Sequence, residues 1–136
     1  MMFVSISTHH LIITLFHTTV HSCAVSPDGD MIYVVNYSRC LLVTLSRDGT
    51  VISDLSVPAQ PTGIHVTESG QVLLCGYSTD KIFQVDRDGR QILAEMVTQN
   101  DGVTHPISIY YSKHTGSLIV GMWNNNDIIV FKALLE

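Results

Sequence analysis

The residues of this chain that could carry acid–base, nucleophilic or metal chemistry are few, and their spacing fits none of the common sites. Four histidines crowd its beginning, at His9, His10, His17 and His21, where they could recruit a metal ion. No carboxylate lies beside them to complete a site, so we interpret them as surface histidines. The chain has no G-x-S-x-G elbow, no phosphate-cradling glycine loop after a strand and no H-E-x-x-H pair. We therefore predict a protein that is not an enzyme, with no catalytic residue, metal or cofactor.

The thiol groups do not suggest a metal or disulfide site either. Cys23, Cys40 and Cys75 are odd in number, lie among aliphatic neighbours and show no C-x-x-C spacing. We interpret them as reduced residues of the core.

Composition limits the possible partners. The 136 residues suffice for one domain, and 46% of them are hydrophobic while 14% are charged, which favours buried sheet. The net charge is −5 and the seven basic residues are scattered, so nucleic acid is an unlikely partner. No apolar run approaches the ~18 residues of a membrane helix. The short apolar segment 11–16 leaves a secretory signal as an alternative, but no Lys or Arg precedes it, and we expect a cytoplasmic protein.

A sequence repeat determines the strands and turns that must position any functional site. Tyr-Ser at 37–38 and Asp-Gly at 48–49 return as Tyr-Ser at 77–78 and Asp-Gly at 88–89, which is 40 residues later. A third copy begins at Pro106, after a longer polar loop. A fixed period of this size indicates a repeated supersecondary unit.

Each copy reads as short strands joined by tight turns. Asp-Gly is a strong hairpin signal, and the turn at 27–30 has Pro and Gly where a turn needs them. The second strand of each copy, at 33–35, 73–75 and 118–120, is apolar throughout, so both of its faces must be covered. A four-stranded unit recurring every ~40 residues with covered faces is typical of a β-propeller blade.

We therefore predict an all-β fold, a partial β-propeller of about three four-stranded antiparallel blades. The blades are expected at about 21–57, 61–98 and 105–136, and residues 1–20 form an irregular segment or remnant strands. A β-sandwich is the alternative. Three blades do not close a ring, so the chain needs missing blades or a protein partner, or associates with itself through open blade faces. Segment 11–17 could supply a missing outer strand to the last blade.

The blade pattern resembles NHL repeats and related six-bladed propellers. The Pro-Asp-Gly turn, the Tyr-Ser pair, the Asp-Gly turn and the final strand 127–132 are similar to the C-terminal blades of tripartite-motif-type proteins. The resemblance implies a protein-interaction module, and it suggests the substrate-binding end of a ubiquitin ligase as the role of that module. Two alternatives follow from the same fold: a metal-dependent hydrolase of the lactonase and regucalcin type, and an RNA-binding propeller. The chain lacks the residues that either alternative requires. Its first strands have no carboxylates to hold the metal of a hydrolase, and only Lys81 keeps the basic position of NHL blades.

The repeat predicts where a binding surface would lie. Tyr37, Tyr77 and Trp123 occupy equivalent positions and should emerge on one rim, with Arg39 and Asp80 beside them. The run Asn124, Asn125 and Asn126 adds adaptable polar groups, a mixture that protein-binding patches favour. A tyrosine at a recurring position can equally pack against the next blade. Trp123 departs from the repeat and is the stronger binding candidate.

Overall fold

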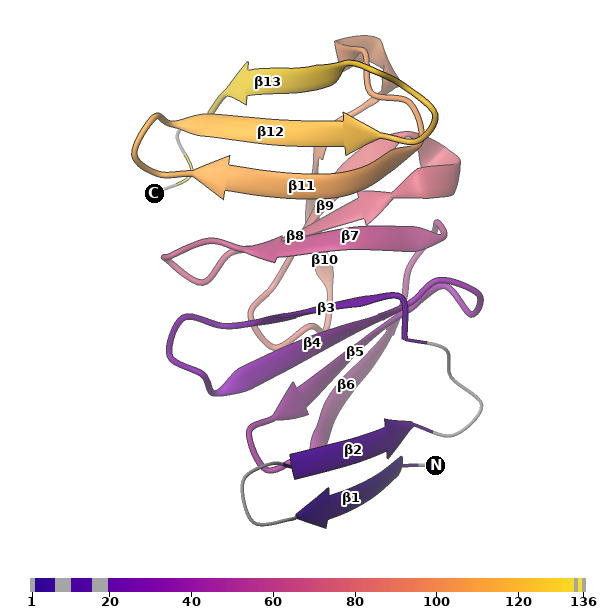
Figure 1. The fold of residues 1–136 in the computed structure, drawn as a ribbon, viewed down its shortest axis with the longest axis vertical. Helices are drawn as coiled ribbons and strands as arrows, with labels where there is room; N and C mark the ends of the chain where they lie inside the picture. The colour runs from indigo at the N-terminus through magenta and orange to yellow at the C-terminus, as the bar shows by residue number, and fades with distance from the viewer. Residues whose placement is uncertain (1, 7–10, 16–19, 134, 136) are drawn as a thin grey trace.

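The computed structural model describes residues 2–6, 11–15, 20–133 and 135. Within this part of the chain the fold is all-β, with three successive antiparallel sheets stacked along the longest axis of the molecule (Figure 1). The partial propeller expected from the repeat is therefore the observed fold class. No helix of the described residues is long and apolar enough to cross a membrane.

The first two sheets have four strands each, in sequence order. We call them blade 1 and blade 2. Blade 1 consists of β3 (Ser22–Val25), β4 (Met31–Asn36), β5 (Leu41–Ser46) and β6 (Val51–Ser56). Blade 2 consists of β7 (Pro61–Val66), β8 (Val72–Gly76), β9 (Lys81–Val85) and β10 (Ile92–Val97). Tight turns connect the strands because glycines such as Gly29 and Gly89 take positive φ, 77° and 69°.

The third sheet, blade 3, contains three strands. It is formed by β11 (Pro106–Ser112), β12 (Ser117–Met122) and β13 (Ile128–Lys132). A short 3₁₀ turn, η2 (Gln99–Asp101), begins the loop that leads into it. The outer edge of β13 has no strand partner among the described residues, whereas β5 and β9 pair with β6 and β10.

The expectation that segment 11–17 completes blade 3 is wrong. β2 (Leu11–Leu15) pairs with β1 (Met2–Ile6) in a separate two-stranded sheet. Figure 1 shows this hairpin at the opposite end of the stack, beyond blade 1. His9, His10 and His17 lie outside the described residues.

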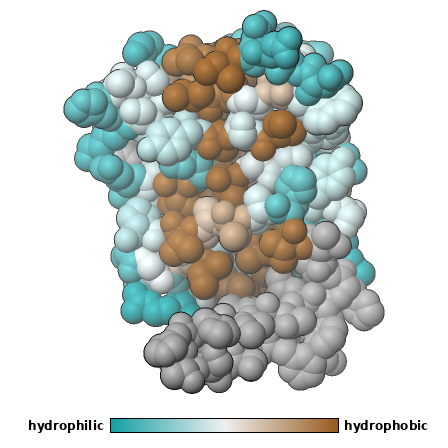
Figure 2. All heavy atoms as spheres, in the orientation of Figure 1, coloured by the Kyte–Doolittle hydropathy of each residue, from teal (hydrophilic) through white to brown (hydrophobic). Residues whose placement is uncertain are grey.

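The core lies between the blades. One cluster joins blades 1 and 2 around the fully buried Tyr33, Leu42, Val72 and Leu74, and a second joins blades 2 and 3. β8 is buried at every position, as a strand covered on both faces must be. Figure 2 shows hydrophobic residues in a band along the stack, with polar residues on its flanks.

Hydroxyl groups of each blade bind main-chain carbonyls of the next. The Ser22 hydroxyl donates to the Thr62 carbonyl oxygen, and Thr62 Oγ1 donates to that of Pro106 at 2.7 Å. The buried Tyr33 donates from its phenol to the Arg87 carbonyl at 2.7 Å. These bonds fix the register of neighbouring sheets, because a misplaced blade would leave the carbonyls unpaired.

The cysteines differ in burial, so their prediction as core residues is correct for one of them only. All three are free thiols. Cys75 is fully buried in β8, and burial raises the pKa of its thiol to about 12. Cys23 is exposed on β3, and Cys40 is half-buried in a turn at φ 55°, just before β5 begins. Aliphatic neighbours in sequence did not reveal that β3 is an edge strand.

Candidate binding rim

The three aromatic residues expected on the rim each follow the second strand of a blade. Tyr37 follows β4, Tyr77 begins the 3₁₀ turn η1 (Tyr77–Thr79) after β8, and Trp123 follows β12. Antiparallel pairing places the end of each second strand beside the start of the first. The Tyr77 N–H therefore donates to the Gln60 carbonyl, and the Trp123 N–H to that of His105, both at 2.9 Å.

The structure brings these rings into one row and adds two histidines to it. We call His21, Tyr37, Tyr77, His105 and Trp123 the aromatic rim. The ring centroids of His21 and Tyr37 are 5.5 Å apart and stacked. Tyr37 and Tyr77 meet edge to face at 6.1 Å, and Tyr77 meets His105 at 4.8 Å and Trp123 at 6.4 Å. Such arrangements are favourable for aromatic pairs.

The spacing of the rings shows that they bridge the blades. Packed sheets lie about 10 Å apart, whereas the rings of successive blades are 6.1 and 6.4 Å apart, so they lean toward one another. Tyr37 and Tyr77 are half-buried in this row, while the side chain of Trp123, with no further blade beyond it in the described chain, is 56% exposed. The two tyrosines therefore pack against neighbouring rings and also form part of the surface. The Trp123 side chain is mainly exposed to solvent.

Asp80 positions the rim. It has a left-handed backbone at φ 57°, and its carboxylate accepts the His105 N–H at 2.8 Å. His105 itself has φ 45°, a conformation uncommon for residues other than glycine, and this bond holds it there. The Asp80 carboxylate lies 3.8 Å from His105 Nδ1. The contact ties the turn of blade 2 to the entry of blade 3, which gives Asp80 a structural task in addition to its predicted place at the surface.

The other predicted polar residues surround the row. Arg39 is exposed in the turn after β4, and its N–H donates to the Oδ1 of the buried Asn36 at 3.1 Å. The three asparagines after Trp123 are exposed. Asn124 is left-handed at φ 52°, and Asn125 accepts the Asp127 N–H at 2.8 Å, which shapes the turn before β13. Asn124 and Asn126 expose their side chains at the surface.

Sequence reasoning missed the two histidines of the rim. His21 was grouped with the histidines at the beginning of the chain, and His105 attracted no attention. Their common signal is position, since each immediately precedes the first strand of a blade, at the end where the tyrosines emerge. The main-chain bonds from His21 N–H to the Val35 carbonyl, 2.8 Å, and from Trp123 to His105 place both rings there.

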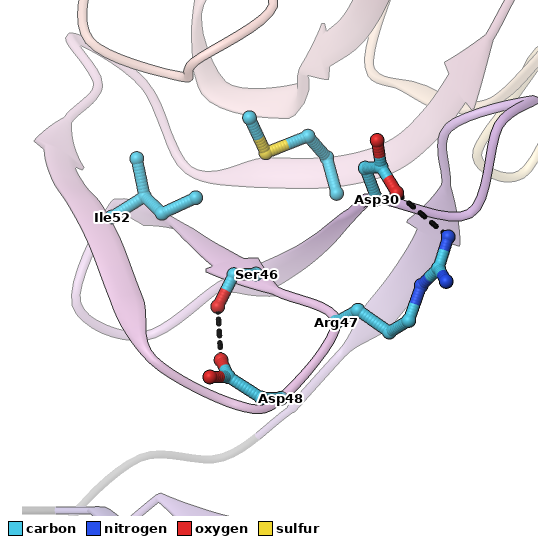
Figure 3. Close-up of a pocket in the computed structure, with 6 residues that line it drawn as sticks. Asp30, Ser46, Arg47, Asp48 and Ile52 are labelled. Carbon is cyan, nitrogen blue, oxygen red and sulfur yellow. Dashed lines mark hydrogen bonds and ion pairs between the residues drawn. The ribbon is translucent and has the colours of Figure 1, made fainter.

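A wide hollow lies elsewhere, beside blade 1. It has a volume of about 540 Å³ and is lined by Asp30, Met31, Ser46, Arg47, Asp48 and Ile52. Figure 3 shows Arg47 reaching Asp30, at 2.7 Å, and Ser46 turned toward Asp48. Arg47 also donates to the carbonyl oxygens of Asp28 and Gly29. The polar groups of Arg47 thus hold two turns together. We therefore assign no binding role to the hollow.

The Asp28 carboxylate is held by several hydrogen bonds at the boundary of blades 1 and 2. Hydrogen bonds from Ser26 and from the Asp30 N–H, together with Arg87 of blade 2, hold its pKa well below the usual value of an aspartate. Arg87 contacts it at 2.5 Å across the blade boundary. The group joins blades 1 and 2 and is exposed, so we assign it to structure.

A hydrolytic metal site would need a cluster of ligands in the described part of the chain. No three His, Cys, Asp or Glu residues gather there closely enough to hold a metal ion. Between β7 and β11 a small hollow of about 140 Å³ brings together His65, Glu68 and His114. His65 packs its ring on Tyr110 at 4.6 Å, and Glu68 pairs with Lys113 at 3.5 Å. These contacts favour packing over metal binding.

Comparison with known proteins supports the fold. No family model matches the chain, and no curated protein is significantly similar to it. Among solved structures it is similar to hydrazine synthase of Kuenenia stuttgartiensis, with a TM-score of 0.73, 21% identity, and 94% of this chain and 36% of that chain covered. It is also similar to virginiamycin B lyase of Staphylococcus aureus, solved as an inactive variant with quinupristin and in selenomethionine form. Both matches have a TM-score of 0.63, 14% identity and 98% of this chain covered.

These neighbours are β-propeller proteins, and the chain spans about half the length of the lyase, 49%, and about a third of the synthase chain. At this level of identity the likeness concerns architecture alone. The chain thus folds as part of a β-propeller, and the aromatic rim is its most developed candidate site.

Proposed function

We propose that this chain is a non-enzymatic interaction module that binds a protein segment along the aromatic rim. The observation that carries the proposal is the continuous row of five rings, which crosses all three blades at one end of the sheets. Large rigid rings lose little conformational entropy on binding and are enriched among residues that dominate protein interfaces.

The chemistry of the rim suits an extended segment with apolar or cationic side chains. The rings offer flat faces and edges, and such groups attract both apolar side chains and the cations of Lys and Arg. Asp80 and the exposed asparagines supply acceptors near the Trp123 end. Trp123 is the expected anchor, because its 56% exposed ring has the most surface to bury.

The resemblance to NHL repeats gives this module a place in a larger assembly. In tripartite-motif-type proteins the propeller recruits the substrate of a ubiquitin ligase. We propose the same role here, with ligase chemistry supplied by other domains. The repeat turns and the three-blade arc support this proposal, while residues of the NHL pattern are kept only in part.

The test separates binding from folding. A photo-crosslinking amino acid placed at position 123 should capture defined proteins from a cell extract, and the same group at Leu93, a comparably exposed position at 52%, should not capture them. Trp123→Ala should abolish capture by a tagged chain at unchanged melting temperature. Trp123→Phe should retain part of it.

Two results would contradict the rim as a binding site. The first is a loss of stability in Trp123→Ala as large as that in Leu118→Ala, where a fully packed side chain is truncated. The second is equal capture by the wild-type chain and Trp123→Ala when both are folded. Tyr77→Ala serves as a matched contrast, because the half-buried Tyr77 contacts three rings and should lose both stability and capture.

A further inference from the structure

The two ends of the aromatic rim differ in charge. At the blade 1 end, the turn after β4 contains Arg39, which is exposed and lies two residues from Tyr37. At the Trp123 end, the loops of blades 2 and 3 have three aspartates and no Lys or Arg. These loops are residues 77–80, 98–105 and 123–127, and their aspartates are Asp80, Asp101 and Asp127. The row of rings therefore runs from a cationic end to an anionic end.

Two of these aspartates lie where the loop before blade 3 meets β13. Gly102, the neighbour of Asp101, lies close to this strand, since a Cβ built on it would be 3.5 Å from Ile129 Cδ1. Asp127 is the residue just before β13, at the end of the turn that begins with Trp123. Both aspartates are exposed. Their carboxylates therefore contribute to the surface on the Trp123 side of the rim.

The acidic groups at the opposite end of the sheets are used differently. There the turns are held by three ion pairs between acidic and basic side chains: Asp28 with Arg87, Asp30 with Arg47, and Glu68 with Lys113. Within the described part of the chain, neither Asp101 nor Asp127 forms an ion pair. Lys81, the basic residue that follows Asp80, pairs with Glu95 at 2.9 Å. The Trp123 end thus keeps a net negative charge.

The rings and carboxylates at this end suit a planar cation. The Trp123 ring is nearly perpendicular to that of Tyr77, at 79°, and its 56% exposure leaves much of the indole open. A cation over such a face is attracted by about 0.5–1 kcal/mol at an exposed site. The Asp80 side chain is 20% exposed and accepts the His105 N–H, and a carboxylate has about four acceptor sites. A guanidinium group can stack on a ring and donate to a carboxylate at the same time.

We propose that the Trp123 end of the rim is a subsite for an arginine side chain of the bound protein segment. The inference rests on the proposed function and names a residue that the segment carries. Arg39 then receives an acidic side chain at the other end. Tyr37 and Trp123 lie 6.1 and 6.4 Å from Tyr77, a span of roughly four residues of extended chain at ~3.3 Å each. The partner segment thus has an arginine and, about four residues away, a glutamate or aspartate.

Peptide titration of the full chain tests the subsite. The fluorescence of Trp123, the only tryptophan of the sequence, reports the binding. The probe is a peptide with blocked ends and the residues Arg-Ala-Ala-Ala-Glu. In its control peptide citrulline replaces arginine, which keeps the size and the planar group and removes the charge. At about pH 8, where imidazole groups are ordinarily neutral, the arginine peptide should bind about fivefold more tightly or better.

Charge variants locate the subsite. Asp127→Lys should weaken binding of the arginine peptide about fivefold and should not weaken that of the citrulline peptide, which has no cation to repel. Asp54→Lys is the matched control, because it makes the same change of charge at an exposed aspartate of β6, the outer strand of blade 1. It should bind both peptides as the wild type does. Arg39→Gln should weaken both peptides alike, since both contain the glutamate.

The outcomes distinguish this inference from the proposed function. If Asp127→Lys lowers the melting temperature, Asp127→Asn replaces it, with an expected loss of about twofold for the arginine peptide. Equal binding of the two peptides, equal effects of the changes at Asp127 and Asp54, or no binding of either peptide at millimolar concentration would overturn the arginine subsite. The proposed function is judged by crosslinking at position 123. It stands if capture persists and is lost in Trp123→Ala, and it fails if the folded variant captures equally.

Discussion

Gly89→Ala is the sharpest test of how the blades pack, because it changes one atom at the boundary of blades 1 and 2. Gly89 has φ 69°, and a Cβ added there would overlap Thr44 Oγ1 and lie 3.0 Å from Thr44 Cβ. Thr44 is fully buried in β5, and its β-branched side chain has little freedom to turn away. The substitution therefore meets both a conformational and a steric penalty.

The two penalties have separate magnitudes. Left-handed backbone costs a residue with a Cβ about 1–2 kcal/mol, and overpacking a filled site costs typically 1–3 kcal/mol. The free energy of unfolding should fall by roughly 2–5 kcal/mol. At ~3–5 °C per kcal/mol for a domain of this size, that is a large drop in melting temperature.

Gly70→Ala measures the conformational part alone. Gly70 also has positive φ, 89°, but a Cβ there would meet only the flexible end of Arg87, at 3.7 Å. It should cost about 1 kcal/mol, within the range for left-handed backbone. Urea denaturation followed by circular dichroism gives both values. Equal losses in the two variants would show that the turn of blade 2 does not press against β5 as described.

A double variant identifies the clash. Thr44→Ala removes the overlapping hydroxyl, which has no hydrogen-bond partner, together with the buried γ-methyl, so by itself it should cost about 1 kcal/mol for the small cavity it leaves. In its background Gly89→Ala should lose at least 1 kcal/mol less than in the wild type, a coupling typical of residues in contact. Strict additivity of the two substitutions would refute the steric argument.

Three further predictions concern the same core. Tyr33→Phe should lower the free energy of unfolding by about 1–3 kcal/mol in urea, since it leaves the Arg87 carbonyl without its buried donor. Thiol labelling followed by mass spectrometry should modify the exposed Cys23 in the native chain and spare Cys75 until unfolding, because burial raises the pKa of Cys75 to about 12; rapid native labelling of Cys75 contradicts its placement. The Asp28 pKa is lowered in the fold, so its contribution is complete above the unfolded value of about 4 and is lost as pH falls below it. The urea midpoint of Asp28→Asn should accordingly depend less on pH in that acid range than that of the wild type.

Much of the fold could be predicted because local signals recur in it. Gly29 and Gly89 stand where the chain needs positive φ, and the apolar run Leu73 to Cys75 requires cover on both faces. Both features depend on residues close together in sequence, so they can be predicted from the sequence directly. The position of the first hairpin could not be predicted, because β2 satisfies its pairing with β1 and strand composition does not say which edge a strand joins.

The candidate site was predictable in part for the same reason. The repeat placed Tyr37, Tyr77 and Trp123 at one end of the sheets, but the ring contacts depend on how sheets lean toward each other. His105 enters the row through a left-handed backbone held by Asp80, a bond between residues 25 apart in sequence. The local sequence does not predict a contact of this kind.

The contacts of the aromatic rim depend on how the blades stack, so binding of a partner at the rim should be coupled to blade stacking. The rings close a gap of about 10 Å between sheets to 6.1 and 6.4 Å, so their spacing depends on the stacking beneath them. A segment bound across the row contacts all three blades and resists their separation. Any ligand that binds only the stacked form stabilises it by mass action. Binding at Trp123 should therefore raise the melting temperature of the chain, and it should offset part of the loss in a variant weakened at the blade boundary, such as Tyr33→Phe. A partner that binds the wild type and leaves the melting temperatures of the wild type and of Tyr33→Phe unchanged would contact a single blade. The row of rings would then serve only to pack the blades together.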